Sequence, residues 1–67
     1  MVVDEYLMVD VDLDWFTEDF DVATRIIRRL EEMKTPYDCE KKTTRWAFVI
    51  HTKNKDAIDI INMLKTI

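Results

Sequence analysis

Residues 44–52 read TRWAFVIHT. Aromatic and β-branched side chains dominate this stretch, and such a composition is typical of a β-strand. Because side chains alternate across a strand, one face carries Trp46, Phe48 and Ile50, and the other carries Ala47, Val49 and His51. Both faces are largely apolar. We expect helices to cover one of them, and the residues alone do not decide which.

The sequence also predicts the elements on either side of this strand. Residues 37–40 are a second, shorter strand, and the polar stretch 41–43 between the two predicts the turn of a hairpin. After the hairpin, Asn54 is placed to cap a helix. The apolar stripe of that helix recurs at three- and four-residue steps and consists of Ala57, Ile60, Ile61, Leu64 and Ile67.

The first half of the chain predicts one strand and one helix. Residues 5–13 alternate, with Leu7, Val9, Val11 and Leu13 on one face and Tyr6, Met8, Asp10 and Asp12 on the other. Thr17 is then placed to cap a helix that runs to about Met33, and Pro36 prevents it from continuing. The apolar stripe of this helix consists of Phe20, Ala23, Ile26, Ile27, Leu30 and Met33.

This order of elements predicts a single α+β domain over residues 1–67, a small β-α-β-β-α sandwich. We expect a three-stranded mixed sheet with two helices on one face, in which the first strand lies parallel beside the third after a crossover through the first helix. The topology resembles the ferredoxin-like split β-α-β arrangement without its last strand. The resemblance is one of topology only, because no residue motif accompanies it.

Composition narrows the classes of function. The 67 residues carry a formal net charge of −4 and include no Gly, which excludes the glycine-rich loops that cradle phosphates. No apolar run is long enough to span a bilayer, so we expect no membrane contact. The single cysteine, Cys39, cannot form an internal disulfide, which predicts a reducing, cytoplasmic location. Cys39 and His51 are expected to be a packed cysteine and an edge histidine rather than a catalytic pair.

Charge is unevenly distributed along the chain. Residues 1–21 carry eight acidic and no basic side chains, and Asp10, Asp12 and Asp14 should project in a row from one face of the first strand. Regularly spaced carboxylates can occupy a basic surface that otherwise binds phosphates, so they can mimic a nucleic acid. The predicted partner-binding residues are Tyr6, Met8, Asp10, Asp12, Asp14, Glu18 and Asp19.

From these features we expect a small, non-enzymatic interaction protein that binds a basic partner protein and uses no cofactor. An inhibitor or antitoxin-like modulator of the kind encoded by phages fits this description. A second copy of the chain is a further expected partner, because a domain this small with an uncovered sheet face buries little area. Aspartates on an edge strand can also serve only to keep that edge solvated and unaggregated.

Two alternatives use other residues or other chemistry. A nucleic-acid-binding module would use a basic set comprising Arg25, Arg28, Arg29, Lys41, Lys42 and Arg45. A divalent-metal-binding domain would use the aspartate row, but a calcium loop requires Gly at its sixth position, and Trp15 stands there. We therefore name no metal ligand.

Overall fold

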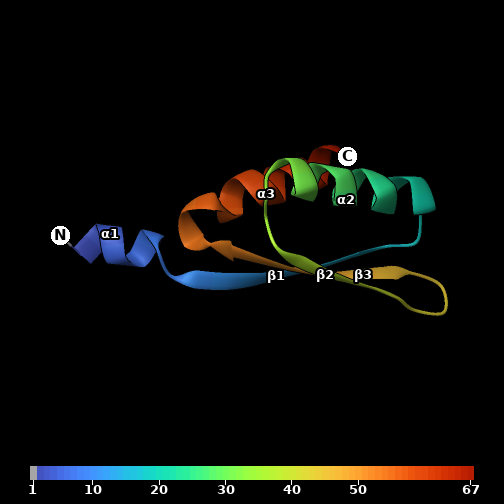
Figure 1. The fold of residues 1–67 in the computed structure, drawn as a ribbon, viewed down its shortest axis with the longest axis horizontal. Helices are drawn as coiled ribbons and strands as arrows, with labels where there is room; N and C mark the ends of the chain where they lie inside the picture. Colours follow the sequence, from blue (N-terminus) through green and yellow to red (C-terminus); the bar gives the residue numbers. More distant parts are fainter. Residues whose placement is uncertain (1) are drawn as a thin grey trace.

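A computed structural model describes the backbone of residues 2–67 and the side chains of residues 5–67. The elements follow in the order α1 (Val2–Leu7), β1 (Asp10–Thr17), α2 (Phe20–Glu32), β2 (Tyr37–Lys41), β3 (Trp46–Lys53) and α3 (Asn54–Thr66). Figure 1 shows α2 and α3 on the same side of the sheet, with α1 projecting beyond the sheet at the other end from the hairpin. The predicted α+β class is confirmed.

The three strands form an antiparallel sheet in the order β1-β3-β2. The first strand does lie beside the third, as expected, but the predicted mixed sheet with a parallel pair is wrong. The crossover through α2 makes β1 and β2 run in the same direction. The tight hairpin then returns β3 in the opposite direction, into the space between them, so β3 is antiparallel to both.

The predicted first strand begins too early. β1 starts at Asp10, while residues 2–7 form α1 and Met8 lies in a turn. The register explains the boundary: Asp10 pairs with Lys53, and the chain enters α3 directly after Lys53. Residues before Asp10 therefore have no β3 residue to pair with, and their alternating pattern is not enough to keep them extended.

The face of β3 that carries Trp46, Phe48 and Ile50 packs against the helices. Cross-strand neighbours on the same face include Leu13 and Trp15 from β1. The buried core consists of Ala23, Ile26, Leu30, Phe48, Ile50, Ile60, Met63 and Leu64. The helical stripes thus supply most of the core, although the terminal members Phe20 and Met33 are exposed.

Both predicted helix caps are displaced. The N-cap of α2 is Asp19, whose carboxylate accepts hydrogen bonds from the backbone N–H of Asp21 and Val22, whereas Thr17 accepts only from the N–H of Asp19. The N-cap of α3 is Lys53, one residue before Asn54. In each case the true cap is set by the residue at which the strand or loop leaves extended geometry.

Candidate functional site

The sheet face opposite the helices is the candidate site. We call it the open face, and it consists of Asp10, Asp12, Asp14 and Phe16 from β1, Asp38 and Glu40 from β2, and Ala47, Val49, His51 and Lys53 from β3. The alternation along each strand places these side chains together, because their neighbours in sequence face the core. The open face therefore carries five carboxylates, one lysine and one histidine around a small apolar group.

The apolar group is defined by the strand register. Val49 lies between Asp14 and Asp38 across the three strands, and Ala47 lies between Phe16 and Glu40. Phe16 is 58% exposed, while Ala47 and Val49 are half-buried. Directly opposite residues on adjacent strands lie about 4.5–5.5 Å apart at Cβ, so each apolar side chain on β3 has a carboxylate beside it.

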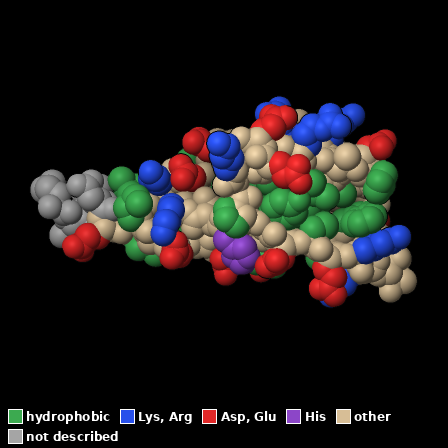
Figure 2. Space-filling model, in the orientation of Figure 1, with side chains coloured by type: hydrophobic (Ala, Val, Ile, Leu, Met, Phe, Trp, Pro, Cys, Tyr) green, Lys and Arg blue, Asp and Glu red, His purple; other side chains and the backbone are tan. Residues whose placement is uncertain are grey.

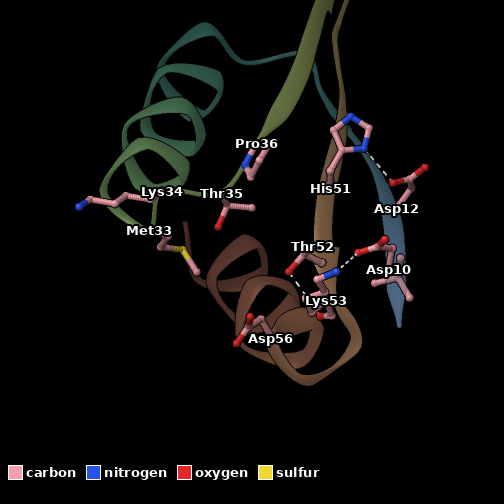
Figure 3. A pocket seen from close by; sticks show the side chains of 11 residues that line it. Asp10, Asp12, Met33, Lys34, Thr35, Pro36, His51, Thr52, Lys53 and Asp56 are labelled. Atoms are coloured by element: carbon pink, nitrogen blue, oxygen red, sulfur yellow. Dashed lines mark hydrogen bonds and ion pairs between the residues drawn. The ribbon is translucent and has the colours of Figure 1, made fainter. Parts of the chain in front are cut away.

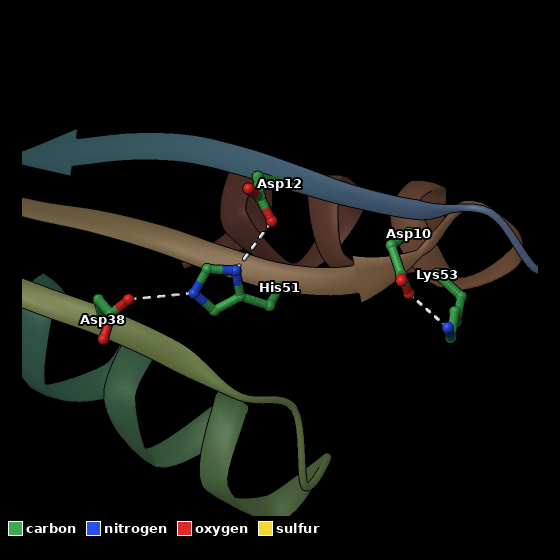
Figure 4. Close-up of polar contacts among 5 residues, drawn as sticks. All are labelled: Asp10, Asp12, Asp38, His51 and Lys53. Atoms are coloured by element: carbon green, nitrogen blue, oxygen red, sulfur yellow. Dashed lines mark hydrogen bonds and ion pairs between the residues drawn. The ribbon is translucent and has the colours of Figure 1, made fainter.

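His51 connects the two edge strands through their carboxylates (Figure 4). Its Nδ1 lies 2.8 Å from Oδ1 of Asp12 on β1, and its Nε2 lies 3.0 Å from Oδ2 of Asp38 on β2. The hydrogen bond to Asp38, followed in size by the hydrogen bond to Asp12, raises the pKa of His51 above its ordinary value. A neutral imidazole has one N–H, so only the imidazolium donates to both carboxylates.

A second charge pair lies beside the histidine. The ammonium of Lys53 donates to Asp10, its cross-strand neighbour. Both side chains line a groove of about 530 Å³ at this end of the sheet (Figure 3). The groove extends from Asp12 and His51 to Lys34 and Thr35 in the connection between α2 and β2, and to Asp56 in the first turn of α3.

The hairpin end of the open face combines cations with aromatic rings. The guanidinium of Arg45 lies 5.0 Å from the centroid of the Phe16 ring, and the ammonium of Lys42 lies 3.2 Å from a carboxylate oxygen of Glu40. A hollow of about 390 Å³ is lined by Phe16, Ala47, Val49 and their neighbours. The apolar group on the open face is thus accessible, with a cationic rim at the hairpin and carboxylates elsewhere.

The predicted acidic site is partly assembled. The row of Asp10, Asp12 and Asp14 lies on the open face of an edge strand, where alternation predicted it. Glu18 follows β1 in a bend and is exposed, and the carboxylate of Asp19 caps α2. The structure places Tyr6 and Met8 in α1 and the following turn, so their predicted position beside the aspartates on the strand is wrong.

The basic residues of the alternative site lie on two elements. Arg25, Arg28 and Arg29 are exposed on α2, while Lys41, Lys42 and Arg45 surround the hairpin turn. The ammonium of Lys41 lies 5.3 Å from the ring centroid of Trp46. On the face that Figure 2 shows, Lys and Arg side chains alternate with Asp and Glu, and the histidine is flanked by acidic side chains.

Cys39 and His51 face opposite sides of the sheet. Cys39 pairs with Phe48 and packs against the core, whereas the His51 ring lies on the open face. Burial raises the pKa of the Cys39 thiol, which disfavours the reactive thiolate. The structure does not bring the two together as a nucleophile and base.

Sequence reasoning missed Asp38 and Lys53 as members of the site. Asp38 lies as far from the hairpin turn as Val49, which is on the open face of β3. Counting outward from the turn along both strands would therefore have placed Asp38 on the open face. Lys53 ends β3, two residues after His51 on the same face, but the sequence did not predict that Asp10 pairs with it.

Among the side chains of residues 5–67, no three His, Cys, Asp or Glu side chains are grouped so that they could hold a metal ion. Within residues 2–67, no helix has the length and apolarity that crossing a membrane requires. Comparison with protein-family models, with curated proteins and with solved structures finds no match for this chain.

Proposed function

We propose that the protein is a non-enzymatic interaction module that binds a basic protein surface through its open face. One observation supports this proposal above the others: an accessible apolar group of Phe16, Ala47 and Val49 is bordered by carboxylates from both edge strands. Apolar patches rimmed by charge are a common feature of protein interfaces. An inhibitor or antitoxin-like modulator in the cytoplasm remains the class of protein that we propose.

The charges on the open face favour a cationic partner. Asp10 pairs with Lys53, and Asp12 and Asp38 both contact His51, but among the described side chains no ion pair joins Asp14 to a cation. Asp14 and Asp38 stand on either side of Val49, so a lysine or arginine of the partner would meet two carboxylates while its stem covers an apolar side chain. Such complementarity increases the association rate and selects against acidic partners.

The test compares two double variants that change charge equally. Asp14→Asn with Val49→Thr alters the open face, and Asp59→Asn with Ile58→Thr makes matching changes on the exposed side of α3, where Ile58 is 61% exposed. A deca-arginine peptide serves as the basic probe, and the same variants immobilised on beads capture partners from lysate. We expect the open-face variant alone to bind the peptide more weakly, with a difference that shrinks at high salt.

Equal binding by both double variants would contradict the proposal, because it would mean that only net charge matters. Nuclease-sensitive capture that depends on Arg28 and Lys42 would instead favour the nucleic-acid-binding alternative. Mass spectrometry of the captured material identifies the partner in either case.

A further inference from the structure

His51 is placed where it can control the open face. It stands on the central strand, and its two ring nitrogens reach Asp12 on one edge strand and Asp38 on the other, 39 and 13 residues away in sequence. Figure 4 shows the ring lying between the two carboxylates. The doubly protonated ring is the one form that satisfies both contacts.

We propose that His51 is a proton-controlled clamp that withholds Asp12 and Asp38 from a basic partner when protonated and frees one of them when neutral. This inference rests on the proposed function, because it describes how binding at the same face is regulated. The chain has a single histidine, so no other histidine contributes to the response.

The surroundings of His51 are predominantly acidic. Besides its two partners, Asp10 and Asp14 lie on the same face of β1, two residues to either side of Asp12. Glu40 lies on the same face of β2, and Asp56 of α3 lines the groove that reaches the ring. The nearby cations are Lys53 on β3 and Lys34 in the loop before β2.

The balance of these groups determines the direction of the pKa shift. The hydrogen bonds to Asp38 and Asp12 favour the imidazolium, desolvation opposes it, and the net result is a raised pKa. His51 therefore holds both carboxylates at mildly acidic pH and releases one of them as the pH rises through its raised pKa.

Loss of the proton has two consequences for a basic partner. One nitrogen then presents a lone pair to a carboxylate, so that carboxylate turns toward solvent, and the face loses one positive charge. A unit charge about 7 Å away in an effective dielectric of about 40–80 changes an ionic association constant by about three- to sevenfold. Because binding and protonation are linked, the partner must also expel the proton as it binds.

The first measurement requires no partner. NMR titration of the His51 ring in the free protein reports its protonation, and we expect a midpoint above the ordinary value of about 6.5. Changing either carboxylate, by Asp38→Asn or Asp12→Asn, should lower that midpoint. A midpoint at or below the ordinary value would overturn the clamp whatever the protein binds.

The second measurement follows deca-arginine binding between about pH 6 and pH 8.5, a range in which the peptide keeps its charge. Calorimetry in two buffers of different ionisation enthalpy counts the protons released. The wild type should bind about three- to sevenfold more tightly at the upper end and release protons near the midpoint. His51→Gln should remove the part of both effects that His51 causes, and any pH dependence that remains in this variant belongs to other groups.

The outcomes separate the two proposals. Binding of the peptide with the same pH dependence in the wild type and in His51→Gln would overturn the clamp and leave the proposed function standing. Failure of the peptide to bind at every pH would overturn the proposed function, and with it the regulatory role, while the NMR titration would still establish whether His51 bridges the two carboxylates.

Discussion

Replacing Asp19 tests the assigned start of α2. One oxygen of its carboxylate, Oδ1, accepts hydrogen bonds from the N–H of Asp21 at 2.8 Å and from the N–H of Val22 at 3.2 Å. Two of the four backbone donors that every helix leaves unpaired at its start are satisfied in this way. Asp19→Ala removes both acceptors and also the negative charge beside the positive end of the helix dipole.

The expected cost follows from these contacts. Loss of an N-cap lowers the free energy of unfolding by about 1 kcal/mol, and loss of an exposed charge at the helix start removes about 0.3–1 kcal/mol more. Asp19→Ala should therefore destabilise the protein by about 1–2 kcal/mol. In a domain of this size each kcal/mol lowers Tm by about 4–8 °C. Asp19→Asn keeps an equally good cap and should lose only the contribution of the charge.

Thermal and urea unfolding followed by circular dichroism measure these differences. Thr17→Val is the matched control: it preserves the shape of a strand residue and removes the hydroxyl that accepts only from the N–H of Asp19. Its effect should stay within about 0.5 kcal/mol. If Thr17→Val costs more than Asp19→Ala, Thr17 is the true cap and the helix begins where the sequence alone suggested.

Four further outcomes are expected. Ile50→Ala removes a fully buried side chain and should cost about 2–5 kcal/mol, seen as a large loss of urea midpoint, whereas Ile50→Val should cost about 0.5–1.5 kcal/mol. The fold raises the pKa of His51, so the stabilising contribution of the protonated ring is complete below about pH 6.5 and is lost as the pH rises through the folded pKa. The urea midpoint of the wild type should therefore fall over that pH range, and the midpoint of His51→Gln should not. Iodoacetamide should modify Cys39 more slowly in the folded than in the urea-unfolded protein, and equal rates would contradict the raised thiol pKa. Self-association stays a prediction, and sedimentation at micromolar concentration tests it. In a dimer formed through two open faces, the five carboxylates of each copy would repel those of the other, so we expect any dimer to use another surface, such as the exposed Tyr6 and Met8.

Local patterns in the sequence determined most of the elements. The three- and four-residue spacing from Phe20 to Met33, followed by Pro36, predicts α2 to within one residue of its end. The aromatic and β-branched run after the turn likewise predicts β3. Both patterns depend on side chains close together in the chain, and local backbone preferences and amphipathicity are sufficient to specify them.

The ends of a strand that depend on pairing with a segment far away in the sequence could not be predicted from such local patterns. Residues 5–9 continue the alternation of β1 but lie beyond the last residue of β3, so no strand lies beside them to accept their hydrogen bonds. The direction of β3 relative to β1 also escaped prediction, because it follows from how the crossover and the hairpin combine rather than from either strand.

The same division holds for the candidate site. Strand periodicity by itself determined that Asp10, Asp12 and Asp14 share a face, and that His51 lies on the opposite face of β3 from Phe48. Only the tertiary structure decided that the helices cover the Phe48 face, and that His51 stands between Asp12 and Asp38. Hydrogen bonds across three strands require a register, and a register is fixed when the core on the other side of the sheet packs, because a slip of one residue would turn Phe48 and Ile50 toward solvent.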